Sequence, residues 1–346
     1  MKSIKIIQKK WLLILFLVLF IVAYRGYDRV LSTKTAHGIR QARDMYAQPK
    51  DTIDVVFMGS SHIHCNVNTA LLWQEYGIAG YDYSAAEQPL WITYHYLKEI
   101  CKYQSPKLVV LDLYAPARFK EDYQYQWLSD NLNGMRFSFN KLQMLFASCE
   151  PKQIWNYFPA MATYHMRYQD LNEEDWEYLT MSKNERAAFK GFTPYFAVVP
   201  QEEPELKEKL AGGITVKSET YLQKIISYTK EHGIDLFLIV TPYITTDDDE
   251  KVYNRVKEIA EKNSLEFNST NYDYSEMGLV FETDFHDYSH LNLLGSNKFT
   301  DYLGKELLQR YDLPDHRGDA RWESWDRHVE AIDQEIEEVL KKQRGF

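Results

Sequence analysis

One uninterrupted block of apolar residues lies close to the start of the chain. Residues 11–24 read WLLILFLVLFIVAY, with no charged side chain among them. Four lysines precede the block: Lys2, Lys5, Lys9 and Lys10. A helix of this length spans about 21 Å, less than the roughly 30 Å hydrocarbon layer of a bilayer. Trp11 and Tyr24 stand where interfacial aromatic residues belong, and Arg25 can extend its charge outward, so the block can cross a slightly thinned bilayer.

We therefore predict an uncleaved signal anchor over residues 1–27. A cleaved signal peptide is the alternative, because its apolar region has a similar length, but no small-x-small cleavage site follows Ala23. A buried core helix is a third and weaker interpretation. The lysines before the block predict an N-terminus on the cytoplasmic side. The rest of the chain is then expected outside the cell, held to the membrane by a single pass.

Short apolar runs alternate with helix-compatible stretches through much of the remaining chain. The strongest runs are 54–58, 108–112 and 236–240, and weaker ones are 80–84 and 265–268. Helical patterns fall at about 90–104 and 217–232. Nearly continuous apolar runs of this length are typical of buried parallel strands. The alternation predicts an α/β fold, with an open and mostly parallel sheet flanked by helices in three layers, as in flavodoxin.

The pattern also divides the chain into regions. Residues 28–50 are polar and read as a stalk, while residues 51–114 and 217–315 form the α/β domain. Residues 115–216 are rich in aromatic residues and predict a mostly helical insertion that caps the C-terminal edge of the sheet. Residues 316–346 contain a one-faced helix, whose apolar positions are Val329, Ile332, Ile336 and Val339. This face is expected to pack on its own domain, with a partner protein as the alternative.

Composition narrows the classes of function. The 346 residues include 40 Lys and Arg against 50 Asp and Glu, so the formal net charge is −10. An acidic surface without a basic patch argues against a nucleic-acid partner. The 3 cysteines are too scattered for a disulfide framework or a zinc site. The 26 tyrosines are in excess, and the aromatic side chains of the insertion either form its core or stack on sugar rings.

Two short motifs carry candidate chemistry. Met58-Gly-Ser-Ser-His62 places serines directly after the first predicted strand, where ligands bind in open α/β sheets. By itself this is also ordinary turn or helix-capping chemistry. Asp284-Phe-His-Asp-Tyr-Ser-His-Leu-Asn292 places Asp287 and His290 three residues apart, so that one turn can pair a carboxylate with an imidazole. The alternative is a polar loop in which Asp287 caps the helix that follows.

Taken together, the two motifs resemble those of the SGNH (GDSL-like) hydrolase superfamily, whose first block is Gly-Asp-Ser and whose last is Asp-x-x-His. The similarity is greatest to its membrane-anchored surface branch, the D-alanyl-transfer proteins of teichoic acid and the acetyltransferases of exopolysaccharide. There the first block often reads Gly-Ser-Ser. The resemblance covers residues 52–115 and 217–312. It implies that Ser61 is the nucleophile, His290 the general base and Asp287 its orienting partner.

The oxyanion-binding groups are less well matched. The family's second-block glycine has its nearest counterparts in Ala85 and Ala86, and no Gly-x-Asn-Asp block follows the third strand. The Ser61 backbone N–H is therefore expected to act with a further donor, for which Gln88 is the candidate. The alternative for Gln88 is a simple helix-start residue before Pro89.

Other residues near the motifs suggest weaker alternatives. His286 is a rival base. His62, His64 and Cys65, with Asp284 and His286, suggest a metal site, but no three of them have a standard ligand spacing, so no metal and no other cofactor is expected. Cys65 is expected to be buried rather than reactive.

These residues and the resemblance predict a membrane-anchored serine esterase or O-acyltransferase that works through an acyl-enzyme. Its expected substrate is an acyl ester of a cell-surface polysaccharide or teichoic polymer, and the family implies a multispanning membrane acyl exporter as partner. A non-catalytic surface protein that uses the same fold for binding or assembly is the main alternative. A metal phosphoesterase is a distant third.

Overall fold

The computed structural model describes residues 2–205 and 210–343. It divides into two compact units, one of Met1–Lys34 with Lys152–Ser182, the other of Thr35–Pro151 with Lys183–Phe346. Parts of the predicted anchor, insertion and C-terminal segment, at residues 1, 206–209 and 344–346, lie outside the described residues.

The larger unit is built on a five-stranded sheet in which every strand pair is parallel. The strands follow the order β2-β1-β3-β4-β5 and are β1 Val55–Met58, β2 Gly80–Asp82, β3 Leu108–Asp112, β4 Asp235–Val240 and β5 Glu266–Ser269. This is the flavodoxin-like order, in which ligands bind beyond the carboxyl ends of the strands. The predicted fold class is confirmed, and the five strands coincide with the predicted apolar runs.

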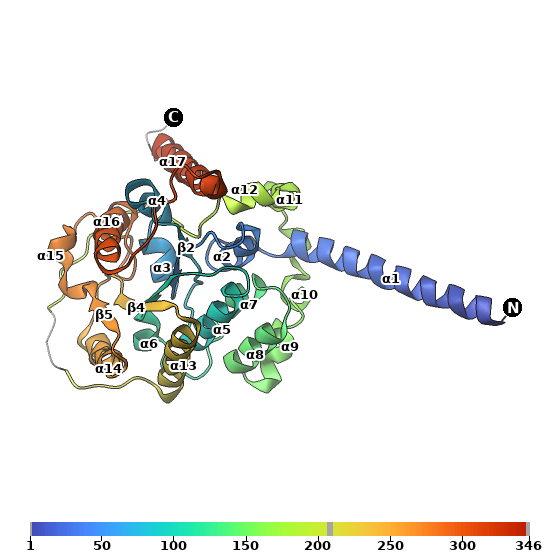
Figure 1. Ribbon diagram of the computed structural model, residues 1–346, viewed down its shortest axis with the longest axis horizontal. Helices are drawn as coiled ribbons and strands as arrows, with labels where there is room; N and C mark the ends of the chain where they lie inside the picture. Colours follow the sequence, from blue (N-terminus) through green and yellow to red (C-terminus); the bar gives the residue numbers. More distant parts are fainter. Residues whose placement is uncertain (1, 206–209, 344–346) are drawn as a thin grey trace. The chain divides into compact units, whose positions relative to one another are not determined.

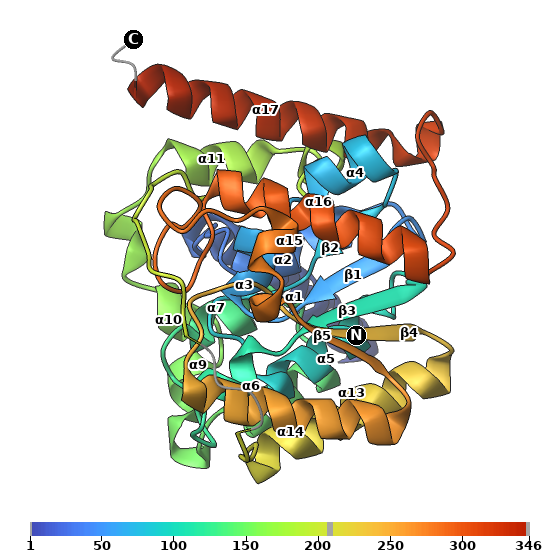
Figure 2. The ribbon, with the colours of Figure 1, turned by 90° about the vertical axis from the view of Figure 1, so that its left-hand side faces the viewer.

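Helices cover both faces of this sheet (Figure 2). One face carries α5 Leu90–Ile100, α13 Val216–His232 and α14 Asp247–Asn263. The other carries α3 Ser61–Asn66, α4 Thr69–Tyr76 and α16 Leu293–Arg310. A buried cluster joins the strands to the second face, with Phe57, Val110 and Ile239 from the strands against Phe299 and Leu303 of α16. Burial of such side chains is the main force holding the layers together, at about 1.5–3 kcal/mol for each.

The remaining elements of the larger unit are short helices, except for the last one. They are α2 Ile39–Asp44, η1 Met45–Ala47, α6 Tyr114–Arg118, α7 Leu128–Asn133, α8 Phe139–Ser148, α12 Lys183–Ala187, η4 Thr270–Tyr272, α15 Tyr274–Met277, η5 Ala320–Trp322 and α17 Glu323–Gln343. In α17, Ile332 is buried against Ala70 of α4 and Phe192. The predicted apolar face of this helix therefore packs on its own unit.

The smaller unit contains the N-terminal helix α1, Lys2–Leu31 (Figure 1). Its part from Lys9 to Leu31 is long and apolar enough to cross a membrane, by length and composition. The helix continues past the predicted anchor into the segment predicted as a stalk. The unit also contains η2 Pro151–Gln153 in part, α9 Ile154–Tyr157, α10 Met161–Tyr164, η3 Arg167–Gln169 and α11 Glu173–Thr180.

A buried ion cluster ties α11 to the end of α1. Asp175 accepts hydrogen bonds from Lys34 Nζ at 2.7 Å and from both guanidinium nitrogens of Arg167, at 2.8 and 2.9 Å. Arg167 also donates to the carbonyl oxygens of Leu31 and Ser32. The segment predicted as a helical insertion contains short helices between Tyr114 and Ala187 but no helix in its described part from 188 to 215, and its segment 152–182 folds with α1.

Candidate active site

Ser61 stands at the carboxyl end of the strand β1, as the first residue of α3. The strand ends at Met58, and Ser60 caps the helix with its Oγ accepting from the His62 N–H. Gly59 between them has φ +154°, and a Cβ there would lie 2.9 Å from Cβ of Asp112 at the end of β3. A glycine is therefore required for the backbone to pass this close to β3 and turn Ser61 outward.

His290 and Asp287 face Ser61 from the turn before α16. His290 Nε2 lies 2.8 Å from Ser61 Oγ, and His290 Nδ1 lies 3.1 Å from both carboxylate oxygens of Asp287. Asp287 Oδ1 also accepts from the backbone N–H groups of Ser289 at 2.7 Å and His290 at 2.8 Å. A short antiparallel bridge between Phe285 and Leu291 closes this turn. The structure thus brings together the three residues that the motifs predict as a triad.

The electrostatics suit a proton-accepting imidazole. Burial raises the pKa of Asp287, but the hydrogen bonds from His290 and from the two backbone N–H groups outweigh it, so that the pKa lies below its usual value. Asp287 is therefore a carboxylate that holds the Nδ1–H tautomer of His290 and leaves Nε2 to accept the Ser61 proton. The His290 side chain keeps 18% of its surface exposed and Asp287 keeps 40%, so solvent reaches the site.

The predicted oxyanion groups occupy different environments. The Ser61 N–H belongs to the first turn of α3, where backbone N–H groups have no partner within the helix. Gln88 is fully buried, and its Nε2 donates to Thr93 Oγ1 in α5 at 2.9 Å. Ala85 is also fully buried. The roles of Gln88 and Ala85 in oxyanion binding stay predictions.

A buried hydrogen-bonded chain lies behind the Ser61–His290 pair. His62 Nδ1 lies 3.1 Å from Thr241 Oγ1, and His62 Nε2 lies 2.9 Å from Ser289 Oγ. The ring stacks on Tyr114, with centroids 3.6 Å apart, and the Tyr114 hydroxyl lies 2.9 Å from the same Ser289 Oγ. Because Ser289 also donates its N–H to Asp287, this chain connects His62 to the predicted triad.

Asp112 anchors the other end of the chain. Its Oδ1 accepts from the Thr241 N–H at 3.1 Å and its Oδ2 from the Tyr114 N–H at 3.3 Å. Burial raises the pKa of Asp112 to about 7 despite these bonds. Burial also lowers the pKa of His62 well below its usual value, so this imidazole is neutral. The Thr241 hydroxyl donates to Asp112 Oδ1 at 3.3 Å. With that direction, His62 Nδ1–H donates to Thr241 Oγ1 and His62 Nε2 accepts from the Ser289 hydroxyl, so each of these side chains has a hydrogen-bond partner.

Further histidines lie around the site. His64 bonds to Ser84 Oγ at 2.9 Å and to His37 Nδ1 at 3.3 Å, instead of joining His62 in a ligand set.

His286, the predicted rival base, stacks on Tyr195 with ring centroids 4.0 Å apart. Tyr195 in turn packs edge-on against His290, at 5.5 Å. Cys65 is fully buried, and burial raises the pKa of its thiol.

The sequence motifs did not indicate the supporting residues. Asp112 and Thr241 could have been found, because polar residues at the carboxyl ends of β3 and β4 face the same edge of the sheet as Ser61. His37 and Tyr195 carry no such signal, because each lies outside the motifs and the strands.

Comparison with known proteins adds little to this geometry. No protein-family model matches the chain, and no curated protein matches it. Among solved structures, one match is a "putative acylhydrolase" from Bacteroides fragilis, with 13% sequence identity and a TM-score of 0.39. The match covers 80% of this chain and 99% of that chain. So low a similarity is not evidence for a shared reaction or substrate.

Proposed function

We propose that this chain is a membrane-anchored serine esterase or O-acyltransferase that acts on acyl esters of a cell-surface polymer. The observation that carries the proposal is the 2.8 Å contact between Ser61 Oγ and His290 Nε2, with Nδ1 of the same imidazole held by Asp287. A binding scaffold would not require a solvent-accessible serine, imidazole and carboxylate in this order. This is the arrangement that activates a serine hydroxyl as a nucleophile.

The reaction proceeds in two balanced steps. Ser61 Oγ attacks the acyl carbonyl carbon while His290 Nε2 takes the hydroxyl proton. The ester bond to the leaving alcohol breaks, the alcohol oxygen receives that proton, and an acyl-Ser61 ester remains. A second hydroxyl then gives its proton to His290 and takes the acyl group, which restores the Ser61 hydroxyl. The Ser61 N–H at the start of α3 stabilises the oxyanion in both steps.

The second hydroxyl decides between the two activities. Water gives an esterase, and a sugar or polyol hydroxyl gives an O-acyltransferase. The helix α1 is long and apolar enough to cross a membrane, and an enzyme anchored in this way would work close to polymers of the cell surface, which favours transfer. On the family resemblance, we propose a multispanning membrane acyl exporter as the source of acyl groups.

Labelling of the active serine tests the proposal directly. The full-length protein in detergent is treated with a fluorophosphonate probe and assayed for hydrolysis of p-nitrophenyl acetate. We expect Ser61→Ala to abolish labelling and to lower the rate by about 10⁴-fold or more, because the nucleophile is lost.

Ser60→Ala is the matched control. It removes the neighbouring hydroxyl, which is buried and caps α3, so labelling at Ser61 should persist. A wild-type protein that takes up no probe and hydrolyses no ester, or a Ser61→Ala protein that keeps full activity, would contradict the proposal. The first outcome would favour a scaffold with the same fold.

A further inference from the structure

Three exposed aromatic residues occupy alternate positions in the segment between α6 and α7. Tyr123, Tyr125 and Trp127 keep 38%, 38% and 40% of their surface exposed. The segment 119–127 has no helix or strand, with bends at 121–122 and a turn at 126–127. We call these three residues the aromatic row. A row of large rings left in solvent is a feature of ligand-binding surfaces.

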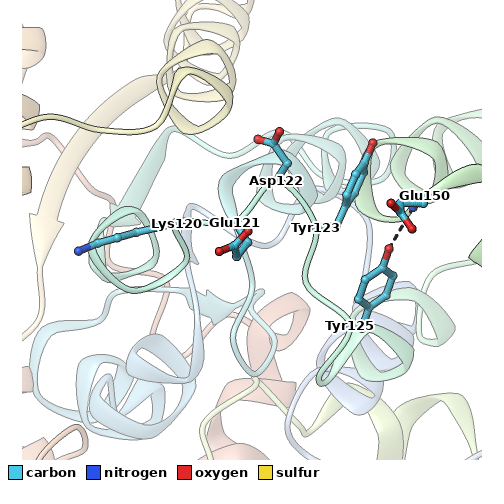
Figure 3. Close-up of a pocket in the computed structure, with 6 residues that line it drawn as sticks. All are labelled: Lys120, Glu121, Asp122, Tyr123, Tyr125 and Glu150. Atoms are coloured by element: carbon cyan, nitrogen blue, oxygen red, sulfur yellow. Dashed lines mark hydrogen bonds between the residues drawn. The ribbon is translucent and has the colours of Figure 1, made fainter.

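A depression of about 460 Å³ lies at the first two members of the row. Figure 3 shows the side chains of Tyr123 and Tyr125 beside Glu150, whose backbone N–H donates to the Tyr125 hydroxyl at 3.3 Å. The other residues of the depression are Lys120, Glu121 and Asp122. The lining residues carry three carboxylates and one ammonium, and Lys217 adds a second ammonium beside the Tyr123 ring, so the depression has a small excess of negative charge.

The segment is held firmly although it is exposed. Lys217 Nζ lies 4.6 Å from the centre of the Tyr123 ring and donates to the carbonyl oxygen of Ala147 at 2.7 Å. Asn131 Nδ2 donates to the carbonyl oxygens of Trp127 and Ala86, at 2.9 and 2.8 Å. The aromatic row is therefore tied to the loop that follows β2.

Backbone strain is concentrated where these two loops meet. Trp127 has φ +59° and Glu87 has φ +48°, which is uncommon for residues other than glycine. Gln124 Nε2, beside the row, donates to the Glu87 carboxylate. Two other non-glycine residues have positive φ: Asp51 lies at a turn, and Ser264 lies at the end of α14. Strain of this kind persists where the surrounding structure imposes it, often at ligand sites.

The row leads to the catalytic residues through two rings. His37 lies 6.3 Å from Trp127 and 6.3 Å from Tyr195, ring centre to ring centre. Tyr195 lies 5.5 Å from His290, the base in contact with Ser61. His37 is itself placed by the Ala86 N–H, which donates to its carbonyl oxygen at 2.8 Å. Ring contacts thus run from Trp127, the last residue of the aromatic row, to His290.

We propose that the aromatic row binds the polymer that accepts the acyl group, and that this polymer is a neutral or amine-bearing polysaccharide. The inference rests on the proposed function and chooses between its two polymer classes. Sugar rings present apolar faces that stack on Tyr and Trp, and their hydroxyl or ammonium groups donate to Glu121, Asp122 and Glu150. A polyanionic teichoic chain would meet like charge at the carboxylates of the depression.

Binding is measured in a Ser61→Ala background, so that it does not depend on catalysis. The probes are N-acetylated chito-oligosaccharides, their deacetylated amine forms and polyglycerol phosphate, titrated against the full-length protein in detergent. We expect the first two to bind, and Trp127→Ala or Tyr125→Ala to weaken binding by about tenfold. Trp127→Phe should recover most of it, because the ring is kept.

Trp176→Ala is the matched control, because it removes an indole that is even more exposed, at 54% against 40% for Trp127, from the smaller unit and should leave binding unchanged. Circular dichroism confirms that each variant is folded. Three results would overturn the inference: unaltered glycan binding in Trp127→Ala, tighter binding of polyglycerol phosphate than of either glycan, or no glycan binding. Serine labelling in the protein that retains Ser61 reports on the proposed function separately, so the two failures are distinguishable.

Discussion

Asp287 and Asp175 each accept several hydrogen bonds, but their surroundings differ. Asp287 accepts hydrogen bonds from two backbone N–H groups and from one imidazole, and its side chain is 40% exposed. Asp175 is buried, and it accepts hydrogen bonds from Lys34 and from both guanidinium nitrogens of Arg167. A carboxylate paired with permanent cations holds its unit together, whereas one paired with an imidazole leaves a group that can gain and lose a proton.

The comparison separates a structural from a chemical use of the same side chain. Neutralising Asp175 removes the carboxylate that pairs with the charges of Lys34 and Arg167, so the expected cost is in stability. Neutralising Asp287 removes the group that fixes the tautomer of His290, so the expected cost is in the catalytic rate. Three predictions test this distinction.

The largest effect is expected for Asp287→Asn. Asparagine keeps the shape of the turn but can donate to His290 Nδ1, which favours the wrong tautomer for accepting the Ser61 proton. We expect kcat for p-nitrophenyl acetate to fall by about 10²–10⁴-fold, with the unfolding temperature changed little. A loss of stability as large as that of Asp175→Asn, without loss of rate, would break the distinction.

Asp175→Asn should affect the smaller unit instead. Burial raises the pKa of Asp175, but the bonds from Arg167 and Lys34 lower it to about 2. A folded-state pKa below the usual 3.8 means a stabilisation on the order of 2 kcal/mol that is present above pH about 4 and is lost as the pH falls towards 2. We expect Asn to remove both the stabilisation and this acid dependence, as followed by the fluorescence of the neighbouring Trp176.

The control for this prediction is Asp248→Asn. Asp248 is exposed and pairs with Lys251 of the same helix, so its loss should change stability much less than the loss of Asp175. Equal effects of the two substitutions would contradict the role assigned to the buried cluster.

The smallest effect is expected for His62→Phe. The substitution removes the hydrogen bonds to Thr241 and Ser289. Ser289 is then held less firmly, and its backbone N–H is one of the donors to Asp287. We expect kcat to fall by about tenfold with KM unchanged. His62→Gln, whose amide nitrogen can donate to Thr241 while its oxygen accepts from Ser289, should recover part of the rate. If Phe had no effect on kcat, the buried chain would be structural only.

Several features of the fold followed from local patterns. The strands β1, β3 and β4 coincide with apolar runs, because a strand buried on both faces needs nearly every side chain apolar. The contact between Asp287 and His290 was also predictable, because residues three apart in one turn are neighbours whatever surrounds them. The insertion was less predictable: its polar and aromatic pattern indicates helices but not that residues 152–182 fold with α1.

The amino-acid sequence by itself determined the apolar N-terminal helix, the parallel strands and the Asp287–His290 turn, because each depends on the spacing of residues close along the chain. Only the tertiary structure decided that Ser61 Oγ lies 2.8 Å from His290, a residue 229 positions away. The same holds for the chain from Asp112 through His62 to Ser289, and for the path from Trp127 through His37. These contacts join loops at one edge of the sheet, so they depend on strand order and on close backbone approach, as at Gly59, which no local pattern specifies.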